Sequence, residues 1–140
     1  MTLAEVYADL IRHGVRCFSG DYALDTGSDA VAVHLGDSWG VFLDDHRIRT
    51  TAEEKVAVSH EWAHIVEDAT YGIDAPRSLV QLAEASACRR QYEAVLPWRT
   101  LSRYLRSGFA PWDIADAESL TEAFVRDAIE YWTQRRGMTA

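Results

Sequence analysis

The chain of 140 residues lacks most features that would set it apart from an ordinary small globular protein. Its only two cysteines, Cys17 and Cys88, cannot form a disulfide framework and do not have the Cys-x-x-Cys spacing of a thiolate metal site. No apolar run approaches the roughly 18 to 20 residues that cross a bilayer, and the N-terminal segment carries acids rather than a basic leader. We therefore expect reduced cysteines and a cytoplasmic protein that does not act at membranes.

Basic residues are also scarce, since 14 Lys and Arg stand against 22 Asp and Glu and give a net charge of -8. This balance disfavours nucleic-acid binding, whose affinity comes mainly from neutralising phosphates. The exception is residues 77–106, which contain 6 basic and 2 acidic side chains. We call five of these basic residues the arginine strip: Arg89, Arg90, Arg99, Arg103 and Arg106. The strip is either a docking surface for an acidic segment of a partner protein or a solvated helix face.

Linkers rich in Pro, Gly or Ser, internal repeats and low-complexity segments are all absent. A length of 140 residues and a hydrophobic content of 48% are typical of one globular unit with its own core. We therefore predict a single domain over residues 1–140.

The N-terminal part of the chain predicts one helix followed by a small sheet. Thr2 and Glu5 have the spacing of a capping box, and an apolar stripe follows them as far as Gly14. Three β-prone stretches, separated by turn residues such as Gly27, then predict an antiparallel meander. Their bounds are 15–18, 31–34 and 39–43.

The remainder of the chain predicts helices. Thr51 and Glu54 have capping-box spacing at the start of the second helix, for which Gly72 is a stop signal. The later helices are expected from about Pro76 to before Pro97, from Trp98 to Leu105 and, after a short helical turn, from a cap at Ser119. We therefore predict an α+β fold dominated by about five helices, with a small three-stranded antiparallel sheet.

The second predicted helix contains the sequence His60-Glu61-Trp62-Ala63-His64, which is an HExxH motif. Because residues four apart share one helix face, both imidazoles can reach a single Zn²⁺ ion, and Glu61 lies beside them. A carboxylate in that place can take a proton from water that the metal activates. The alternative is a polar helix face on which two histidines and a glutamate are merely exposed.

A catalytic zinc site also needs a third protein ligand and an open coordination position. No histidine follows His64, so an acid is the remaining choice. Glu67 is a turn too far along the same helix to share an ion with the first histidine, and Asp68 points elsewhere. Glu84 lies on a stripe of small apolar residues, where a buried carboxylate would need a partner such as a metal on a facing helix. Otherwise Glu84 is a rim residue paired with an arginine.

Several motifs in a fixed order resemble the ImmA/IrrE family of small zinc metallopeptidases. That family has a strand ending in an acid, a helix with HExxH, and a later helix with E-x-x-A that ends before a proline. The corresponding segments here are GVFLDD (40–45), RTTAEEKVAVSHEWAHIV (49–66) and EASACRRQYEAVLP (84–97), and residues 113–132 are similar to the family's last helices. Arg90 and Gln91 stand where the family usually has an aromatic-alanine pair.

The resemblance implies a minimal zincin, a metallopeptidase domain that holds one catalytic Zn²⁺ ion. It makes His60, His64 and Glu84 the zinc ligands, and Glu61 the general base that later protonates the leaving amine. The oxyanion-stabilising residue stays open among Tyr71, Tyr92, Tyr104, His34 and His46. Family members cleave a specific regulatory protein, commonly a helix-turn-helix repressor of a phage or mobile element, so the expected partner is a transcriptional repressor.

Two other functions compete with proteolysis. One is a regulatory module that keeps the zincin fold but sequesters its partner instead of hydrolysing it, although a purely structural metal site has no need of Glu61. The other is DNA binding by the last two helices, but acids outnumber bases in residues 113–132, where Arg126 is the only basic side chain. The sequence therefore favours a zinc-dependent metalloendopeptidase that acts on a protein.

Overall fold

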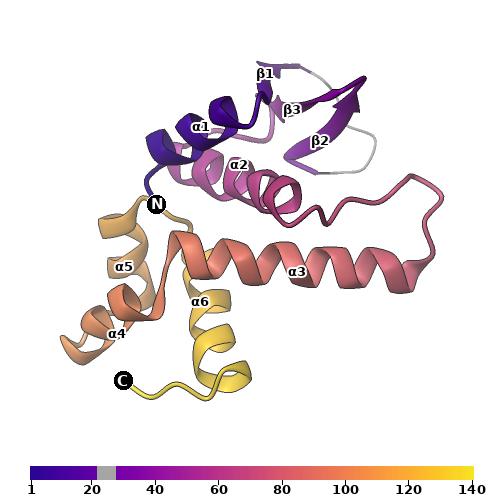
Figure 1. The fold of residues 1–140 in the computed structure, drawn as a ribbon. Helices are drawn as coiled ribbons and strands as arrows, with labels where there is room; N and C mark the ends of the chain where they lie inside the picture. Colours follow the sequence, from indigo (N-terminus) through magenta and orange to yellow (C-terminus); the bar gives the residue numbers. More distant parts are fainter. Residues whose placement is uncertain (22–27) are drawn as a thin grey trace.

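The computed structural model describes residues 1–21 and 28–140, and Gly27, expected in a turn, lies outside them. Its elements are, in order, α1 (Leu3–Arg12), β1 (Arg16–Gly20), β2 (Ala30–Leu35), β3 (Ser38–Asp44), α2 (Thr51–Val66), α3 (Arg77–Val95), α4 (Trp98–Arg106), α5 (Pro111–Glu118), α6 (Glu122–Glu130) and the π-helical turn η1 (Tyr131–Arg135). Figure 1 shows α2 between the sheet and α3, with α4, α5 and α6 gathered near the C-terminal end of α3. The expected helix-dominated α+β fold is confirmed. None of the described helices has the length and apolar character needed to cross a membrane.

The sheet is mixed, which corrects the expected antiparallel meander. Its strand order is β1-β3-β2, with β2 antiparallel and β1 parallel to β3. A tight turn at Gly36 and Asp37 joins β2 to β3 and forces their antiparallel pairing. Residues 21–29 separate β1 from β2, and a connection of this length does not by itself fix the direction of β1. The strand with most buried residues, β3, takes the centre and leaves β2 at an edge.

The predicted cap of the first helix is confirmed, but the cap of α2 lies one residue earlier than expected. Thr2 and Glu5 form a capping box at the start of α1. At the start of α2, the Thr50 hydroxyl accepts a hydrogen bond from the Glu53 N–H at 3.1 Å. Thr51 is already helical, and Glu54 accepts a hydrogen bond from the Tyr7 hydroxyl at 2.6 Å instead. A tertiary contact therefore uses the acid that the sequence assigns to the cap.

The later helices follow the proline signals, with one correction at a cap. α3 begins directly after Pro76 and ends before Pro97, as expected. The last long helix, α6, is capped by the Thr121 hydroxyl, not by Ser119. Ser119 has a left-handed backbone with φ of 54° and ends α5, so the next helix needs a new cap after it. α2 itself ends at Val66, well before the expected stop.

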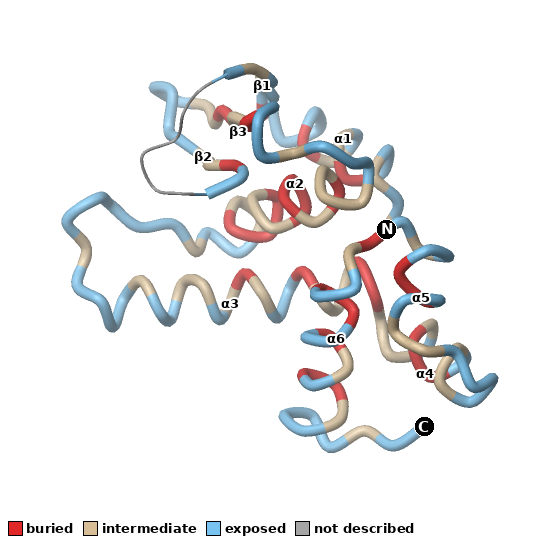
Figure 2. The backbone as a smooth tube through the Cα atoms, turned by 180° about the vertical axis from the view of Figure 1, so that it is seen from behind, coloured by how far each residue is buried: buried red, intermediate tan, exposed pale blue. Residues whose placement is uncertain are grey.

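The buried residues form two clusters that meet at α2 and α3. One cluster joins α1, the sheet and α2, and it contains Leu10, Val41, Val58 and Trp62. The other joins the C-terminal end of α3 to α4, α5 and α6, and it contains Leu96, Leu101, Ile114 and Val125. Figure 2 shows that α2 is buried along much of its length, whereas the N-terminal half of α3 is mainly exposed. The functional motif therefore lies on the better-packed helix.

Candidate metal centre

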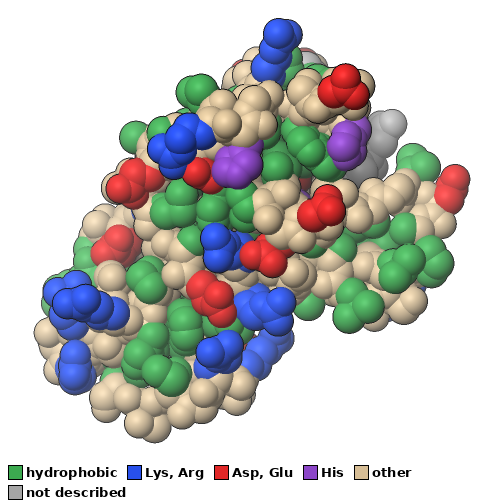
Figure 3. Space-filling view, in the orientation of Figure 1, with side chains coloured by type: hydrophobic (Ala, Val, Ile, Leu, Met, Phe, Trp, Pro, Cys, Tyr) green, Lys and Arg blue, Asp and Glu red, His purple; other side chains and the backbone are tan. Residues whose placement is uncertain are grey.

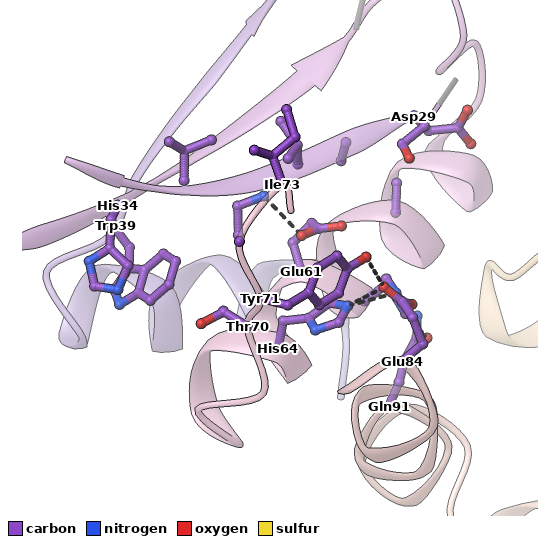
Figure 4. Close-up of a pocket in the computed structure, with 18 of the residues that line it drawn as sticks. Asp29, His34, Trp39, Glu61, His64, Thr70, Tyr71, Ile73, Glu84 and Gln91 are labelled. Carbon is purple, nitrogen blue, oxygen red and sulfur yellow. Dashed lines mark hydrogen bonds and ion pairs between the residues drawn. The ribbon is translucent and has the colours of Figure 1, made fainter. Parts of the chain in front are cut away.

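A cavity of about 1160 Å³ opens between β2, α2, the loop after α2, and α3. Its lining includes all four residues singled out by the sequence, which come from two helices: His60, Glu61, His64 and Glu84. In Figure 4, Glu61 points toward β2, while His64 and Tyr71 meet Glu84 on the α3 side. The expected helix face is therefore a wall of a cavity and not a solvated surface.

The three predicted ligands converge on one point. Nε2 of His60 lies 2.9 Å from Oε2 of Glu84, and Nε2 of His64 lies 3.1 Å from Oε1 of the same carboxylate. The two Nε2 atoms are themselves 3.1 Å apart. In a tetrahedral zinc site with bonds of about 2.0–2.1 Å, neighbouring donor atoms are about 3.3 Å apart, which is close to the separation of the two Nε2 atoms. His60, His64 and Glu84 can therefore hold a metal ion.

The other ring nitrogen of each histidine has its own partner, which leaves Nε2 for the ion. Nδ1 of His64 lies 2.7 Å from the main-chain oxygen of Ala69, to which it donates. Nδ1 of His60 lies 3.3 Å from Oε1 of Gln91 on α3. This is the usual arrangement around a metal, in which an outer hydrogen bond fixes the ring of each ligand. Sequence reasoning missed Gln91, which it had treated only as a departure from the family pattern.

Glu84 reaches this cluster from α3 as predicted, but it is less buried than the stripe of small residues implied. Ala87, one turn further along the helix, is fully buried, whereas 38% of the Glu84 side chain is exposed. Hydrogen bonds from His60 and His64 hold the pKa of Glu84 well below its ordinary value. Among the described residues its partners are these two histidines and Tyr71, so the alternative of a rim residue paired with an arginine is wrong.

Glu61 lies beside the ligands without joining them. Its Oε2 accepts a hydrogen bond from the main-chain N–H of Ala32 in β2 at 2.9 Å. Burial raises the pKa of Glu61, although the two neighbouring histidines and the Ala32 N–H act in the opposite direction. A carboxyl group whose pKa is raised holds a proton more readily than an ordinary carboxylate, which favours a role in proton transfer.

The neighbours of the two histidines favour protonated, positively charged rings, a state that a bound cation would change. Burial disfavours the charged ring of His60, but hydrogen bonds to Cys88 and Glu84 outweigh it and raise its pKa to about 10. Burial likewise opposes a charge on His64, yet hydrogen bonds to Glu84 and Ala69 raise its pKa. Without a cation the cluster therefore holds a proton beside Glu84, and a bound metal ion would replace that proton.

The five candidates for an oxyanion stabiliser are spread over the molecule. Only Tyr71 reaches the ligands, because its hydroxyl donates to Oε1 of Glu84 at 2.8 Å, and burial together with this carboxylate raises its pKa to about 12. His34 also lines the cavity, but it packs on Trp39 at the other end (Figure 4). The remaining three have structural contacts away from the site: Tyr92 with Phe124 and Tyr131, Tyr104 with Glu118, and His46 with Asp21.

Glu67, which follows the HExxH motif, has a partner away from the ligands, and the arginine strip is also separate from them. Glu67 forms an ion pair with Arg90 at 3.5 Å, and this guanidinium also lies over the Trp62 ring. The strip is divided, since Arg89 and Arg90 are on α3 and the other three arginines follow one exposed face of α4. Figure 3 shows basic side chains gathered over the helical C-terminal part of the molecule. The strip therefore spans two helices.

No protein-family model, curated protein or solved structure matches this chain. The chemistry of the centre must therefore be inferred from its own residues. Two imidazoles and one carboxylate, with a buried second carboxylate beside them and a cavity in front, form the kind of donor set that binds zinc in hydrolytic sites.

Proposed function

We propose that this chain is a zinc-dependent metalloendopeptidase of the ImmA/IrrE type. One observation carries the proposal. Three donor groups from α2 and α3 converge within 3.1 Å of one another, and Glu61 stands next to them with its carboxylate free of the ligand set. A structural zinc site uses four protein ligands and needs no neighbouring base, whereas a hydrolytic site uses three ligands and one base.

The donor types favour zinc over the alkaline-earth ions. Imidazole nitrogens suit Zn²⁺, while Ca²⁺ and Mg²⁺ prefer sites made of oxygen ligands. His60, His64 and Glu84 would hold the ion, which would acidify the attacking water and polarise the scissile carbonyl group. Glu61 would take the proton from that water and pass it to the amine that leaves, since its carboxylate lies beside the ligands without joining them.

The position of β2 supports a peptide substrate. β2 is an edge strand, and its residues from Ala30 to His34 line the cavity. The Ala32 N–H points away from β3 toward Glu61, so the outer edge of the strand faces the metal ligands. An extended peptide could pair with this edge and bring one carbonyl group to the ligands. We propose that the substrate is a regulatory protein, with a helix-turn-helix repressor of a phage or mobile element as the leading candidate.

The test is cleavage of the repressor encoded beside the gene. Purified wild-type protein should cut it when loaded with Zn²⁺ and should stop when a chelator removes the ion. Glu61→Gln should keep the zinc but lose about 10²- to 10⁴-fold in rate, the range of a general base. Glu67→Gln is the matched control, because this acid directly follows the same helix but contacts Arg90 instead of the ligands.

Equal cleavage by wild-type protein and Glu61→Gln would exclude the proposed mechanism. Binding and inactivation of the repressor without any cut would instead support the regulatory module that sequesters its partner. The two functions are separated by one gel, because only hydrolysis changes the length of the repressor.

A further inference from the structure

Gln91 is the most deeply buried polar side chain that α3 presents to α2. It lies two turns after Glu84, on the same face of the helix, and only 3% of its surface is exposed. A buried amide is favourable only when its hydrogen-bonding groups have partners. The hydrogen-bond partners of the Gln91 amide are all on α2. These partners determine which way the amide faces.

The nitrogen of the Gln91 amide is fixed by two acceptors. Nε2 donates to the main-chain oxygen of Val56 at 2.8 Å and to Oγ of Ser59 at 2.7 Å. The Ser59 hydroxyl gives its own hydrogen to the Val56 oxygen at 3.2 Å, so it acts as an acceptor toward Gln91. Turning the amide over would place its oxygen against the carbonyl oxygen of Val56, which cannot donate. The oxygen Oε1 must therefore face His60.

The orientation of Gln91 then determines the tautomer of His60. Oε1 can only accept, so the hydrogen in the 3.3 Å contact belongs to Nδ1 of the imidazole. Without a metal ion, Nε2 carries a second hydrogen that faces Glu84. When a metal ion replaces that hydrogen, the one held at Nδ1 stays, and the lone pair of Nε2 is available to the ion. A metal ligand needs this lone pair.

We propose that Gln91 is a positioning residue that sets the tautomer and ring orientation of His60 and thereby the affinity of the centre for Zn²⁺. The proposal rests on the metal centre of the proposed function, but it is independent of peptide hydrolysis. The two ligands differ in this respect, because His64 is held by the main-chain oxygen of Ala69 and His60 by a side chain. Only the support of His60 can be removed by a substitution.

The chemistry of an amide suits this place better than that of a carboxylate. Glu61 and Glu84 already put two carboxylates next to the histidines. A third would add like charge, and it could not donate to Val56 or Ser59. A glutamine supplies the acceptor for His60 and both donors without a charge.

The test compares zinc affinities of the full chain by competition with a chromophoric chelator, in the absence of any substrate. Gln91→Met has a similar volume and no acceptor for Nδ1, so zinc should bind about 10- to 100-fold more weakly, the usual effect of losing such a partner. Gln91→Glu restores the acceptor and should bind more tightly than Gln91→Met. Gln81→Met is the matched control, since Gln81 is exposed on the same helix, and it should bind as wild type.

Long-range proton–nitrogen spectra of the zinc-loaded protein give a readout that packing alone would not change. Wild-type protein should show His60 protonated at Nδ1, and Gln91→Met should show this signal weakened or exchanging. Ser59→Ala removes one acceptor of the Gln91 amide and should cause a smaller loss of zinc affinity than Gln91→Met. It replaces Gln91→Met in the test if that variant does not fold.

Wild-type affinity and an unchanged His60 signal in folded Gln91→Met, or in Ser59→Ala if Gln91→Met does not fold, would overturn the proposal. Failure of wild-type protein to bind zinc would overturn it together with the metal centre. Zinc binding that depends on Gln91, in a protein that cuts no repressor, would support the positioning role and count against the peptidase alone.

Discussion

α2 and α3 both supply residues to the candidate metal centre, but they are held in the fold to different degrees. α2 lies between the sheet and α3 and has seven buried residues out of 16. α3 has three buried residues out of 19, and they lie in its C-terminal part (Figure 2). The ligands follow the same trend, because the His64 side chain is 7% exposed and that of Glu84 is 38% exposed.

This difference divides the centre into a rigid part and an adjustable part. The two histidines and Glu61 are fixed by one packed helix, whose Trp62 also donates to Asp9 of α1 at 2.7 Å. Glu84 lies one turn before the first fully buried residue of α3, so its helix is supported on one side only. We therefore expect changes on α2 to affect both the fold and the metal, and changes at Glu84 to affect mainly the metal.

The largest effects are expected from removing a ligand on each helix. His64→Ala and Glu84→Ala should each weaken zinc binding by more than about 100-fold, the upper end of the effect of losing a mere supporting bond. In metal-free protein, His64→Ala should lower the free energy of unfolding by about 1–3 kcal/mol, because it removes a buried hydrogen-bonded group. Glu84→Ala should lower the free energy of unfolding by less than about 1 kcal/mol, the usual contribution of an ion pair that is exposed to solvent.

Chelator competition and urea unfolding in the presence of a chelator measure these two quantities. Equal losses of stability in the two variants would contradict the expected difference between the helices. Undiminished zinc affinity in Glu84→Ala would remove this residue from the ligand set.

The next effect is the pH dependence of zinc binding. The pKa of His60 is raised from 6.5 to about 10, so at neutral pH the metal must displace a proton held between α2 and Glu84. Apparent zinc affinity should therefore rise by at least about tenfold per pH unit between pH 6 and 9. In metal-free protein the sign is opposite: protonated His60 stabilises the fold below pH 6.5, and this contribution is lost as the pH rises through about 10.

Zinc titrations and thermal unfolding at a series of pH values test this prediction. Glu84→Gln is the control, since it removes the carboxylate that favours the charged ring, and it should shift the metal-free stability profile of His60 to lower pH. A zinc affinity that is flat from pH 6 to 9 would contradict the predicted displacement of a proton.

A smaller effect is expected at the start of α2. Thr50→Ala should lower the free energy of unfolding by about 1 kcal/mol, because its hydroxyl caps the helix. Thr51→Ala changes a residue that is already helical and should have little effect. Urea denaturation of the two variants compares them directly. A larger loss in Thr51→Ala would place the cap where the sequence alone suggested it.

The smallest effect is expected on the α3 side of the centre, at Tyr71. Tyr71→Phe removes the hydroxyl that donates to Glu84, a bond between partly exposed groups, so zinc should bind several-fold more weakly, by about 0.5–1 kcal/mol. Because the pKa of Tyr71 is about 12, the ratio of the two affinities should stay constant across neutral pH. A ratio that changes between pH 6 and 9 would show that another group holds Glu84.

Features that depend on neighbours along the chain were predictable. Residues four apart share a helix face whatever surrounds the helix, so the HExxH motif places His60, Glu61 and His64 together. The prolines before and after α3 similarly set its bounds, because proline lacks the N–H that a helix interior needs. The contact of Glu84 with a facing helix was also predictable, since a lone acid among small apolar residues indicates a partner on another helix.

Choices between equivalent local signals were not predictable. Thr50 with Glu53 and Thr51 with Glu54 are two overlapping capping boxes, and the sequence offers no way to choose between them. The hydroxyl of Tyr7, on α1, donates to Glu54, and the Thr50 hydroxyl caps α2. The Glu53 carboxylate accepts from the Arg49 N–H, so the reciprocal bond of a capping box is not formed.

The amino-acid sequence by itself determined the composition of the candidate centre: which two histidines, which glutamate beside them, and that an acid had to complete the set. The tertiary structure alone decided the parallel pairing of β1 with β3, the exposure of Glu84 and the contact of Gln91 with His60. The physical reason is the distance along the chain. Helix periodicity fixes contacts within four residues, whereas His60 meets Glu84 and Gln91 across 24 and 31 residues, where only packing of α3 against α2 sets the geometry.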